Sequence, residues 1–188
     1  MYIWVFLISI LALVFGSFLC LVFRKKPNLT NKIGSLVSVF GGVLSAFASG
    51  VLLLTGQEQS LYAPWNVPFG SFHISIDSLS AFFILAIAAI CSLAAVYGRA
   101  YLLPYQDKKG LGPFWFFYNL LFAAMLLVAS ARNGILFLVA WEVMSIASFF
   151  LVVFEHEKKE VISAGWTYLV ATHVGTAFLF TMFILLGW

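Results

Sequence analysis

Six apolar stretches, each about as long as a lipid bilayer is thick, constrain this chain more than any other feature. A membrane-spanning helix needs about 20 consecutive, mainly apolar residues. The stretches that qualify lie at approximately 1–23, 34–56, 78–103, 112–131, 134–154 and 161–187. They leave little room for a soluble domain within the 188 residues. We therefore predict an all-α, polytopic membrane helix bundle that forms a single transmembrane domain over residues 1–188.

The composition supports this class and excludes others. The chain is 63% hydrophobic and 9% charged, whereas a typical soluble domain carries about 25% charged residues. The net charge of +3 does not indicate a nucleic-acid partner, because the ten lysines and arginines gather in short segments between the apolar stretches. Cys20 and Cys91 lie in apolar runs without a neighbouring histidine or cysteine at metal-ligand spacing, so we expect them to be packing residues.

The positive charges predict the orientation in the membrane. The connections after the first, third and fifth apolar stretches hold nine of the ten lysines and arginines, and Arg132 is the single one on the opposite side. Positively charged loops stay in the cytoplasm, so both termini are expected outside. The first stretch lacks a basic region in front of it and is too long for a signal peptide, which favours a retained helix.

The longest connection, residues 57–77, is expected on the outer side. Its alternating segment SFHISI is typical of a short hairpin, or of a cap that lies on the membrane surface. Tyr62 and Trp65 are expected at headgroup depth. We assign no chemistry to His73, because a lone histidine in a hairpin is more often solvated than a ligand.

Small residues recur every fourth position along the second apolar stretch. They are Gly34, Ser38, Gly42, Ala46 and Gly50. Such a ridge allows another helix backbone to approach closely. We interpret it as a packing surface and not as a binding site.

One carboxylate, Glu142, interrupts the apolar run LFLVAWEVMSIASFFLVVF at 136–154. A charge at this depth costs about 2.5 kcal/mol or more, and intramembrane ionisable residues usually mark an ion or proton pathway. His173 lies at a similar depth in the next apolar stretch. Ser145, Thr172, Thr176 and Asn119 are further polar residues expected near this level.

The residues themselves leave two interpretations of these polar groups open. A carboxyl and an imidazole can exchange a proton through hydroxyl groups and water, which favours a proton or cation path through Glu142 and His173. Alternatively, a neutral Glu142 hydrogen-bonds a neighbouring helix and His173 is a packing group. Asn119 fits a hydrogen bond between helices better than a place on the path.

Three segments resemble a known family. They are ISIDSLSAFFILAI, YNLLFAAMLLVASARNGILFLVAWEVMSIASFFLV and AGWTYLVATHVGTAFL. They are similar to the antiporter-like subunits of respiratory complex I, Mrp cation/proton antiporters and membrane-bound hydrogenases. WEVMSIASFFLV and AGWTYLVATHVGT most resemble the membrane subunit (component B) of hydrogenase-4 and formate hydrogenlyase.

The resemblance implies roles for two residues. Glu142 matches the fifth-helix glutamate that the family uses in proton translocation, and His173 falls in the hydrogenase-like segment of the sixth helix. In the family this glutamate pairs with a lysine on a seventh helix, but no lysine lies inside a predicted span here and the chain stops at Trp188. The sequence thus looks like the N-terminal part of the antiporter-like fold, from a split gene, a truncated reading frame or a natural short form.

Two functions follow from the resemblance. The first is the N-terminal fragment of a proton-translocating, non-catalytic subunit of a hydrogenase-4, formate hydrogenlyase or complex-I-like NADH:quinone oxidoreductase. Electron transfer would take place in partner membrane and peripheral subunits, which would hold the iron–sulfur clusters and the nickel–iron centre, with no cofactor in this chain. The second is a structural scaffold, or an Mrp-type antiporter fragment without transport activity alone. The expected location is the prokaryotic cytoplasmic membrane.

The charge distribution generates a prediction about topology. Single cysteines introduced at residues 28, 107 and 158 should be labelled from the cytoplasmic side, because all three positions lie in the basic connections. The measurement is labelling with a membrane-impermeant maleimide in intact cells and in inverted vesicles. Labelling of all three positions in intact cells would reverse the topology.

Overall fold

A computed structural model of the chain confirms the polytopic helical architecture, with six helices long and apolar enough to cross a membrane in the part of the chain that it describes. That part comprises residues 2–65, 70–106 and 109–186. The predicted helix ends at 1 and 187, part of the outer loop, and positions 107 and 108 in a basic connection lie outside it. The helices are α1 Tyr2–Val22, α2 Pro27–Thr55, α3 Ser78–Tyr101, α4 Leu111–Ser130, α5 Gly134–Val152 and α6 Lys159–Leu186.

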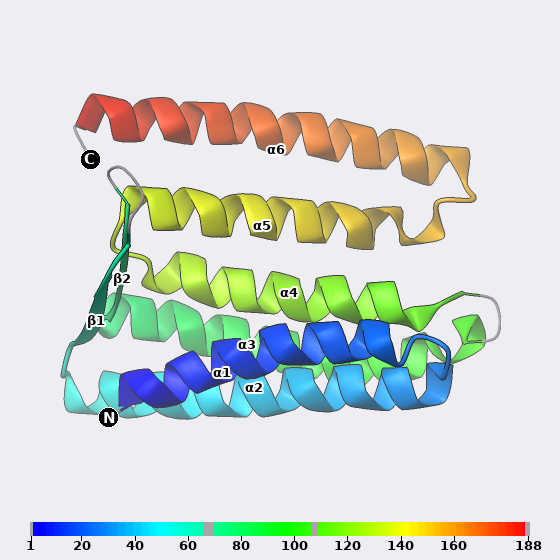
Figure 1. Cartoon of the computed structure of the whole chain (residues 1–188), viewed down its shortest axis with the longest axis horizontal. Coiled ribbons are helices and arrows are strands. Elements are labelled where there is room, and N and C mark those ends of the chain that lie inside the picture. The colour runs from blue at the N-terminus through cyan, green and yellow to red at the C-terminus, as the bar shows by residue number, and fades with distance from the viewer. Residues whose placement is uncertain (1, 66–69, 107–108, 187–188) are drawn as a thin grey trace.

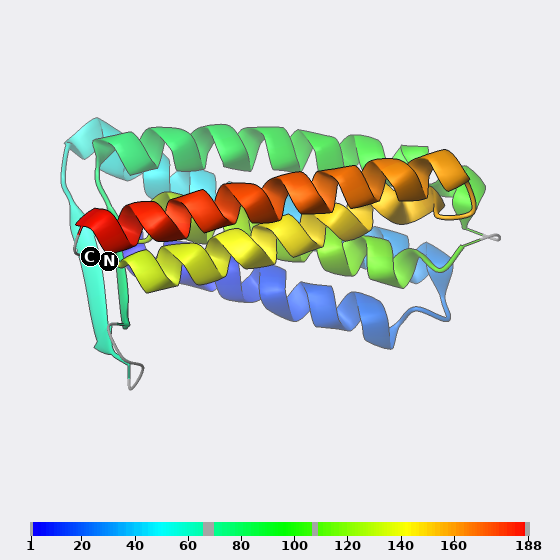
Figure 2. The same cartoon turned by 90° about the horizontal axis from the view of Figure 1, so that it is seen from above.

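The six helices run side by side along the long axis of the molecule (Figure 1). Both termini lie at one end, next to the two strands, and the α1–α2, α3–α4 and α5–α6 connections lie at the other. We call the latter the basic end, because these connections hold the cluster of positive charges. Figure 2, seen from above, shows α6 alongside α5 over the length of both helices.

Two helices begin earlier than the apolar pattern predicts. Helix α2 starts at Pro27 and not at residue 34, and α6 starts at Lys159. Proline suits the first turn of a helix because its missing N–H would have no intrahelical partner there. Helical hydrogen bonding therefore extends beyond the apolar run at the start of each of these helices. The apolar run predicts the part of a helix that lies in the membrane, and it does not predict where the helix begins.

The hairpin prediction for the outer loop is confirmed. Strand β1 (Gln59–Pro64) pairs antiparallel with β2 (Ser71–Ile76). Ile74 and Ile76 of β2 are buried in the same core as the helices. Tyr62 lies opposite His73, with the two rings in an edge-to-face contact at 5.8 Å, so His73 is a hairpin residue.

An ion pair fixes the start of α3 to the α4–α5 connection. The Asp77 side chain accepts a hydrogen bond of 2.7 Å from the backbone N–H of Ser80, which caps α3. Its second oxygen lies 2.6 Å from Nη2 of Arg132. The Ser80 hydrogen bond, followed by the Arg132 charge, holds the pKa of Asp77 below its usual value. Arg132, read from the sequence only as a topology signal, is thus also a structural residue.

The small ridge of α2 is a packing surface over part of its length. A Cβ atom at Gly34 would overlap the Trp115 ring of α4, and one at Gly42 would overlap Oγ of Ser92 in α3. Gly50, at the end nearer the hairpin, has no neighbour within 4 Å of such an atom in the described residues. The ridge therefore brings α4 close to α2 at Gly34 and α3 close to α2 at Gly42.

We predict that Gly42→Leu destabilises the bundle by about 1–3 kcal/mol, the range for overpacking a close contact. The new side chain would meet Ser92 Oγ, and its Cβ would lie 3.3 Å from the Ala88 carbonyl oxygen. The measurement is thermal unfolding in detergent, followed by circular dichroism. Gly50→Leu is the matched control on the same helix and should leave the unfolding temperature almost unchanged. Equal effects of the two substitutions would contradict this account of the ridge.

The Asp77–Arg132 pair generates a pH prediction. Because folding lowers the pKa of Asp77, its contribution is present above the ordinary value of about 3.9 and is lost as the pH falls through the folded-state value. Asp77→Asn keeps an oxygen that can cap α3 but removes the charge. We expect it to lower stability at neutral pH by about 0.5–1 kcal/mol, the range for a partly exposed pair. Unfolding in detergent as a function of pH measures this, and an unchanged acid dependence in the variant would contradict it.

Candidate functional site

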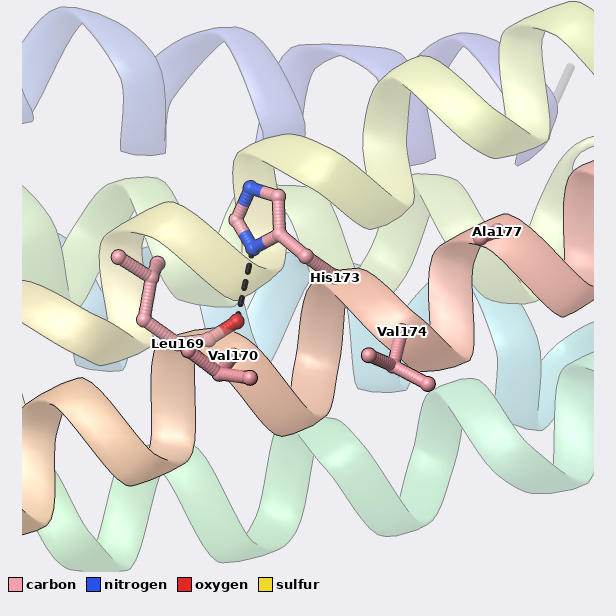
Figure 3. Close-up of a pocket in the computed structure, with 5 residues that line it drawn as sticks. All are labelled: Leu169, Val170, His173, Val174 and Ala177. Atoms are coloured by element: carbon pink, nitrogen blue, oxygen red, sulfur yellow. Dashed lines mark hydrogen bonds between the residues drawn. The ribbon is translucent and has the colours of Figure 1, made fainter.

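Glu142 and His173 face each other across the seam between α5 and α6. Oε2 of Glu142 lies 3.7 Å from Nε2 of His173. The other ring nitrogen, Nδ1, lies 2.9 Å from the carbonyl oxygen of Leu169, one turn earlier on α6 (Figure 3). A carbonyl accepts only, so this contact requires the proton on Nδ1. The Nε2 lone pair of the neutral ring is then directed toward the carboxyl group.

The distance places the pair just outside direct hydrogen bonding. A hydrogen bond between these atoms spans about 2.7–3.2 Å. A side-chain rotation that shortens the gap by less than about 1 Å would therefore make one. The Glu142 side chain is 32% exposed and that of His173 is 51% exposed. Their position is thus at the edge of the bundle and not in its interior, although each side chain points toward the other helix.

Helix α6 explains this exposure. Gly165 is the single residue that is buried in the described part of α6. Apolar hollows lie on both sides of the pair. One, of about 440 Å³, is bounded by Glu142, Val143, Thr176 and neighbouring apolar residues of α5 and α6. The other, of about 400 Å³, lies along α6 beside His173 (Figure 3).

Of the other predicted polar residues, Thr176 comes nearest to Glu142. It shares the 440 Å³ hollow with Glu142, while its hydroxyl donates to the Thr172 carbonyl at 3.1 Å. The Thr172 hydroxyl donates to the Leu169 carbonyl at 2.9 Å. Ser145 is buried one turn after Glu142, and its carbonyl accepts a hydrogen bond from Ser148. Among the described residues, none of these three side chains hydrogen-bonds to Glu142 or His173.

Asn119 lies between α2 and α4, in keeping with the interpretation that it hydrogen-bonds between helices. Its Oδ1 accepts a 2.7 Å hydrogen bond from Ser38 of α2, and its Nδ2 donates to the Trp115 carbonyl at 3.0 Å. The Trp115 indole in turn donates to Asn31 at 3.0 Å. All these groups are buried. Asn119 is therefore a hydrogen-bonding link between α2 and α4, the role that an amide between packed helices usually has.

The sequence analysis missed a second polar contact between α5 and α6. The hydroxyl groups of Ser148 and Tyr168 lie within hydrogen-bonding distance. Ser148 follows Glu142 by six residues, and Tyr168 precedes His173 by five. Because the two helices are antiparallel, these spacings place both hydroxyls at one level on the basic-end side of the pair. The similar spacing of Ser148 from Glu142 and of Tyr168 from His173 was the feature of the sequence that could have predicted this contact.

The structure offers no evident metal ligand set. Within the described ranges, no three histidine, cysteine, aspartate or glutamate side chains lie close enough to hold an ion. Cys20 is buried and Cys91 is partly buried, and both are free thiols. The polar groups described at the site are the Glu142 carboxyl, the His173 imidazole and the nearby hydroxyl groups.

The fold and site define a class: a polytopic membrane bundle with a carboxyl–imidazole pair halfway along two neighbouring helices. Residues 131–188 match the family described as "NADH:quinone oxidoreductase/Mrp antiporter, TM". The chain is 30% identical over 181 residues to hydrogenase-4 component B of Escherichia coli K12, with 95% of this chain and 26% of that protein covered. It is 35% identical over 183 residues to Na(+)/H(+) antiporter subunit A1 of Staphylococcus haemolyticus, covering 95% of this chain and 22% of that protein.

A solved structure shows the same fold. A chain of the membrane-bound sulfane sulfur reductase, an archaeal respiratory membrane complex, matches with a TM-score of 0.76 and 20% identity, over 93% of this chain and 35% of that one. The protein belongs to the antiporter-like membrane-subunit family of NADH:quinone oxidoreductases, Mrp antiporters and hydrogenases. It spans about a quarter of the length of the curated relatives that it matches.

Proposed function

We propose that this chain is part of a proton-translocating membrane subunit and that Glu142 and His173 form a proton-binding station within it. The observation that carries the proposal is the 3.7 Å approach of the carboxyl oxygen to the imidazole nitrogen halfway along two membrane helices. Ionisable groups at this depth are costly and typically serve ion or proton pathways. The family relationship supports the same role.

The geometry supports a direct proton exchange between the two side chains. With Nδ1–H held by the Leu169 carbonyl, a proton on the Glu142 carboxyl can pass to Nε2 of His173. The products are a carboxylate and an imidazolium, which attract each other strongly in a medium of low dielectric constant. A further acceptor must then remove a proton from His173 before the imidazole can accept another from Glu142. The site is therefore one station and not a complete path.

The finer assignment is a subunit of a hydrogenase-4, formate hydrogenlyase or complex-I-like assembly in the prokaryotic cytoplasmic membrane. Similarity to hydrogenase-4 component B over 95% of the chain supports it. Partner subunits would carry electrons through iron–sulfur clusters and a nickel–iron centre, and this chain would bind no cofactor. The basic end would face the cytoplasm, with both termini outside.

A structural role is the second candidate, and one observation favours it. Helix α6 contacts mainly α5, and its remaining surface is open in the described residues. Such a surface suits a scaffold that packs against a partner and moves no proton. A fragment of an Mrp-type antiporter is the third, supported by the 35% identity to antiporter subunit A1.

We predict that Glu142 gives a neutral carboxyl band in infrared spectra of the chain in lipid nanodiscs. The neutral carboxyl band should be absent in Glu142→Gln. His173→Gln should change the frequency of the band, because the carboxyl group loses the imidazole that lies 3.7 Å from it. Glu160→Gln, which removes an exposed carboxyl at the basic end, is the control and should retain the band. Identical spectra of wild type and Glu142→Gln would exclude a proton-binding role for Glu142. The structural scaffold would then be the favoured function.

A further inference from the structure

A separate cavity of about 580 Å³ opens at the basic end, between the start of α4 and the end of α5. We propose that it binds one zwitterionic phospholipid with an amine headgroup, of the phosphatidylethanolamine type. The phosphate would lie at Lys109 and His156, the amine at Glu157, and the upper part of an acyl chain along the aromatic wall of the cavity. This site does not depend on the proposed role of Glu142 and His173.

The depth of the cavity fits a lipid. Its lining extends from Gly110, which precedes α4, to Phe117, seven residues later. At 1.5 Å per residue this is about 10 Å along the helix. The polar interface on one side of a bilayer is roughly 5–8 Å thick. A cavity that starts at the end of the helix therefore crosses the headgroup region and enters the hydrocarbon edge.

The rim carries both signs of charge. Lys109 Nζ donates to the Phe154 carbonyl at 2.9 Å and to Glu157 Oε2 at 2.6 Å. An ammonium group has three N–H donors, so a third remains for a phosphate oxygen. The exposed His156 side chain also lines the cavity and supplies a second donor. Glu157 keeps 58% of its side chain exposed, which leaves its carboxylate accessible to a primary amine.

This mixture of charges favours a zwitterion over an anionic headgroup. The Glu157 carboxylate lies 2.6 Å from the Lys109 ammonium. A headgroup with only negative charge would be attracted by Lys109 but repelled by Glu157. The Lys109 ammonium is also held in place, because it lies 4.8 Å from the centre of the Phe154 ring. The cationic half of the site is thus ordered before a ligand binds.

The inner wall is aromatic. The rings of Phe117 and Phe150 stack at 4.2 Å between centroids, across the α4–α5 contact. Phe114 and Phe154 meet edge to face at 5.2 Å. These side chains offer apolar surface directly below the charged rim, which is the order of polar and apolar groups along a phospholipid.

The proposal is tested by native mass spectrometry of the chain released from nanodiscs that contain equal amounts of phosphatidylethanolamine and phosphatidylglycerol. Wild type should retain one phosphatidylethanolamine in preference to phosphatidylglycerol. The double variant Lys109→Gln/His156→Gln should retain about tenfold less, as expected for the loss of a charge-assisted hydrogen bond. Lys25→Gln, an exposed lysine at the same end, is the charge-matched control and should behave as wild type.

A second variant blocks the cavity without changing its charges. A Cβ atom at Gly110 would have no neighbour within 4 Å in the described residues, so Gly110→Leu should fold and place its side chain in the opening. It should reduce retention of phosphatidylethanolamine as the double variant does. Equal retention in wild type and both variants would overturn the proposal, as would preferential retention of phosphatidylglycerol. Competition by inorganic phosphate alone would also overturn it, because it would indicate an anion site without lipid.

Discussion

The bilayer core offers no water to satisfy polar groups, and the arrangement of polar side chains in this protein depends on that constraint. Serine hydroxyls of α2 return to the carbonyl one turn earlier, as Ser45 and Ser49 do at 2.9 and 2.8 Å. Asn31 uses both ends of its amide, accepting from Trp115 and donating to the Arg99 carbonyl at 3.0 Å. These polar groups bond within their own helix or to a neighbouring helix and have little capacity left for other chemistry. Oγ of Ser92 in α3 is an exception, since it is buried without a hydrogen-bond partner in the described structure.

The α5–α6 seam departs from this pattern. Glu142 and His173 approach each other without completing a hydrogen bond, and both remain partly exposed. The indole N–H of Trp141, beside Glu142, is buried without a hydrogen-bond partner in the described structure. Unsatisfied groups inside a membrane protein cost free energy. A second such atom, Oγ of Ser92 in α3, lies away from the seam, so the feature particular to the seam is the incomplete contact between two ionisable side chains. That contrast is the structural basis for assigning proton chemistry to the seam.

The sequence predicted the helices, the hairpin and the proximity of Glu142 to the sixth helix, because each depends on a local pattern of apolar and polar residues. It also predicted a similar level for His173 and Glu142, whose side chains lie 3.7 Å apart. It did not predict that Asn119 hydrogen-bonds to Ser38. The surface of α4 is evenly apolar, so its sequence does not indicate which side of the helix faces α2. The Asp77–Arg132 pair was not predicted either, because its members lie in two connections that are separated by two helices in the chain. Helix ends were misjudged where helical hydrogen bonding continued into the polar segments at Pro27.

The proximity of Glu142 and His173 depends on the rotation of α6 about its own axis. One residue corresponds to about 100° of rotation, so a slip by a single position would turn the imidazole away from the carboxyl. Contacts on both sides of the pair oppose such a slip. Toward the basic end, Gly165 lies so close to Val153 that a Cβ atom would overlap it, and Tyr168 contacts Ser148. Toward the termini, the rings of Phe183 and Phe137 meet at 5.6 Å. Packing on both sides of the pair thus sets the distance between the Glu142 carboxyl and the His173 imidazole. Most of these packing contacts are made by residues that carry no ionisable group.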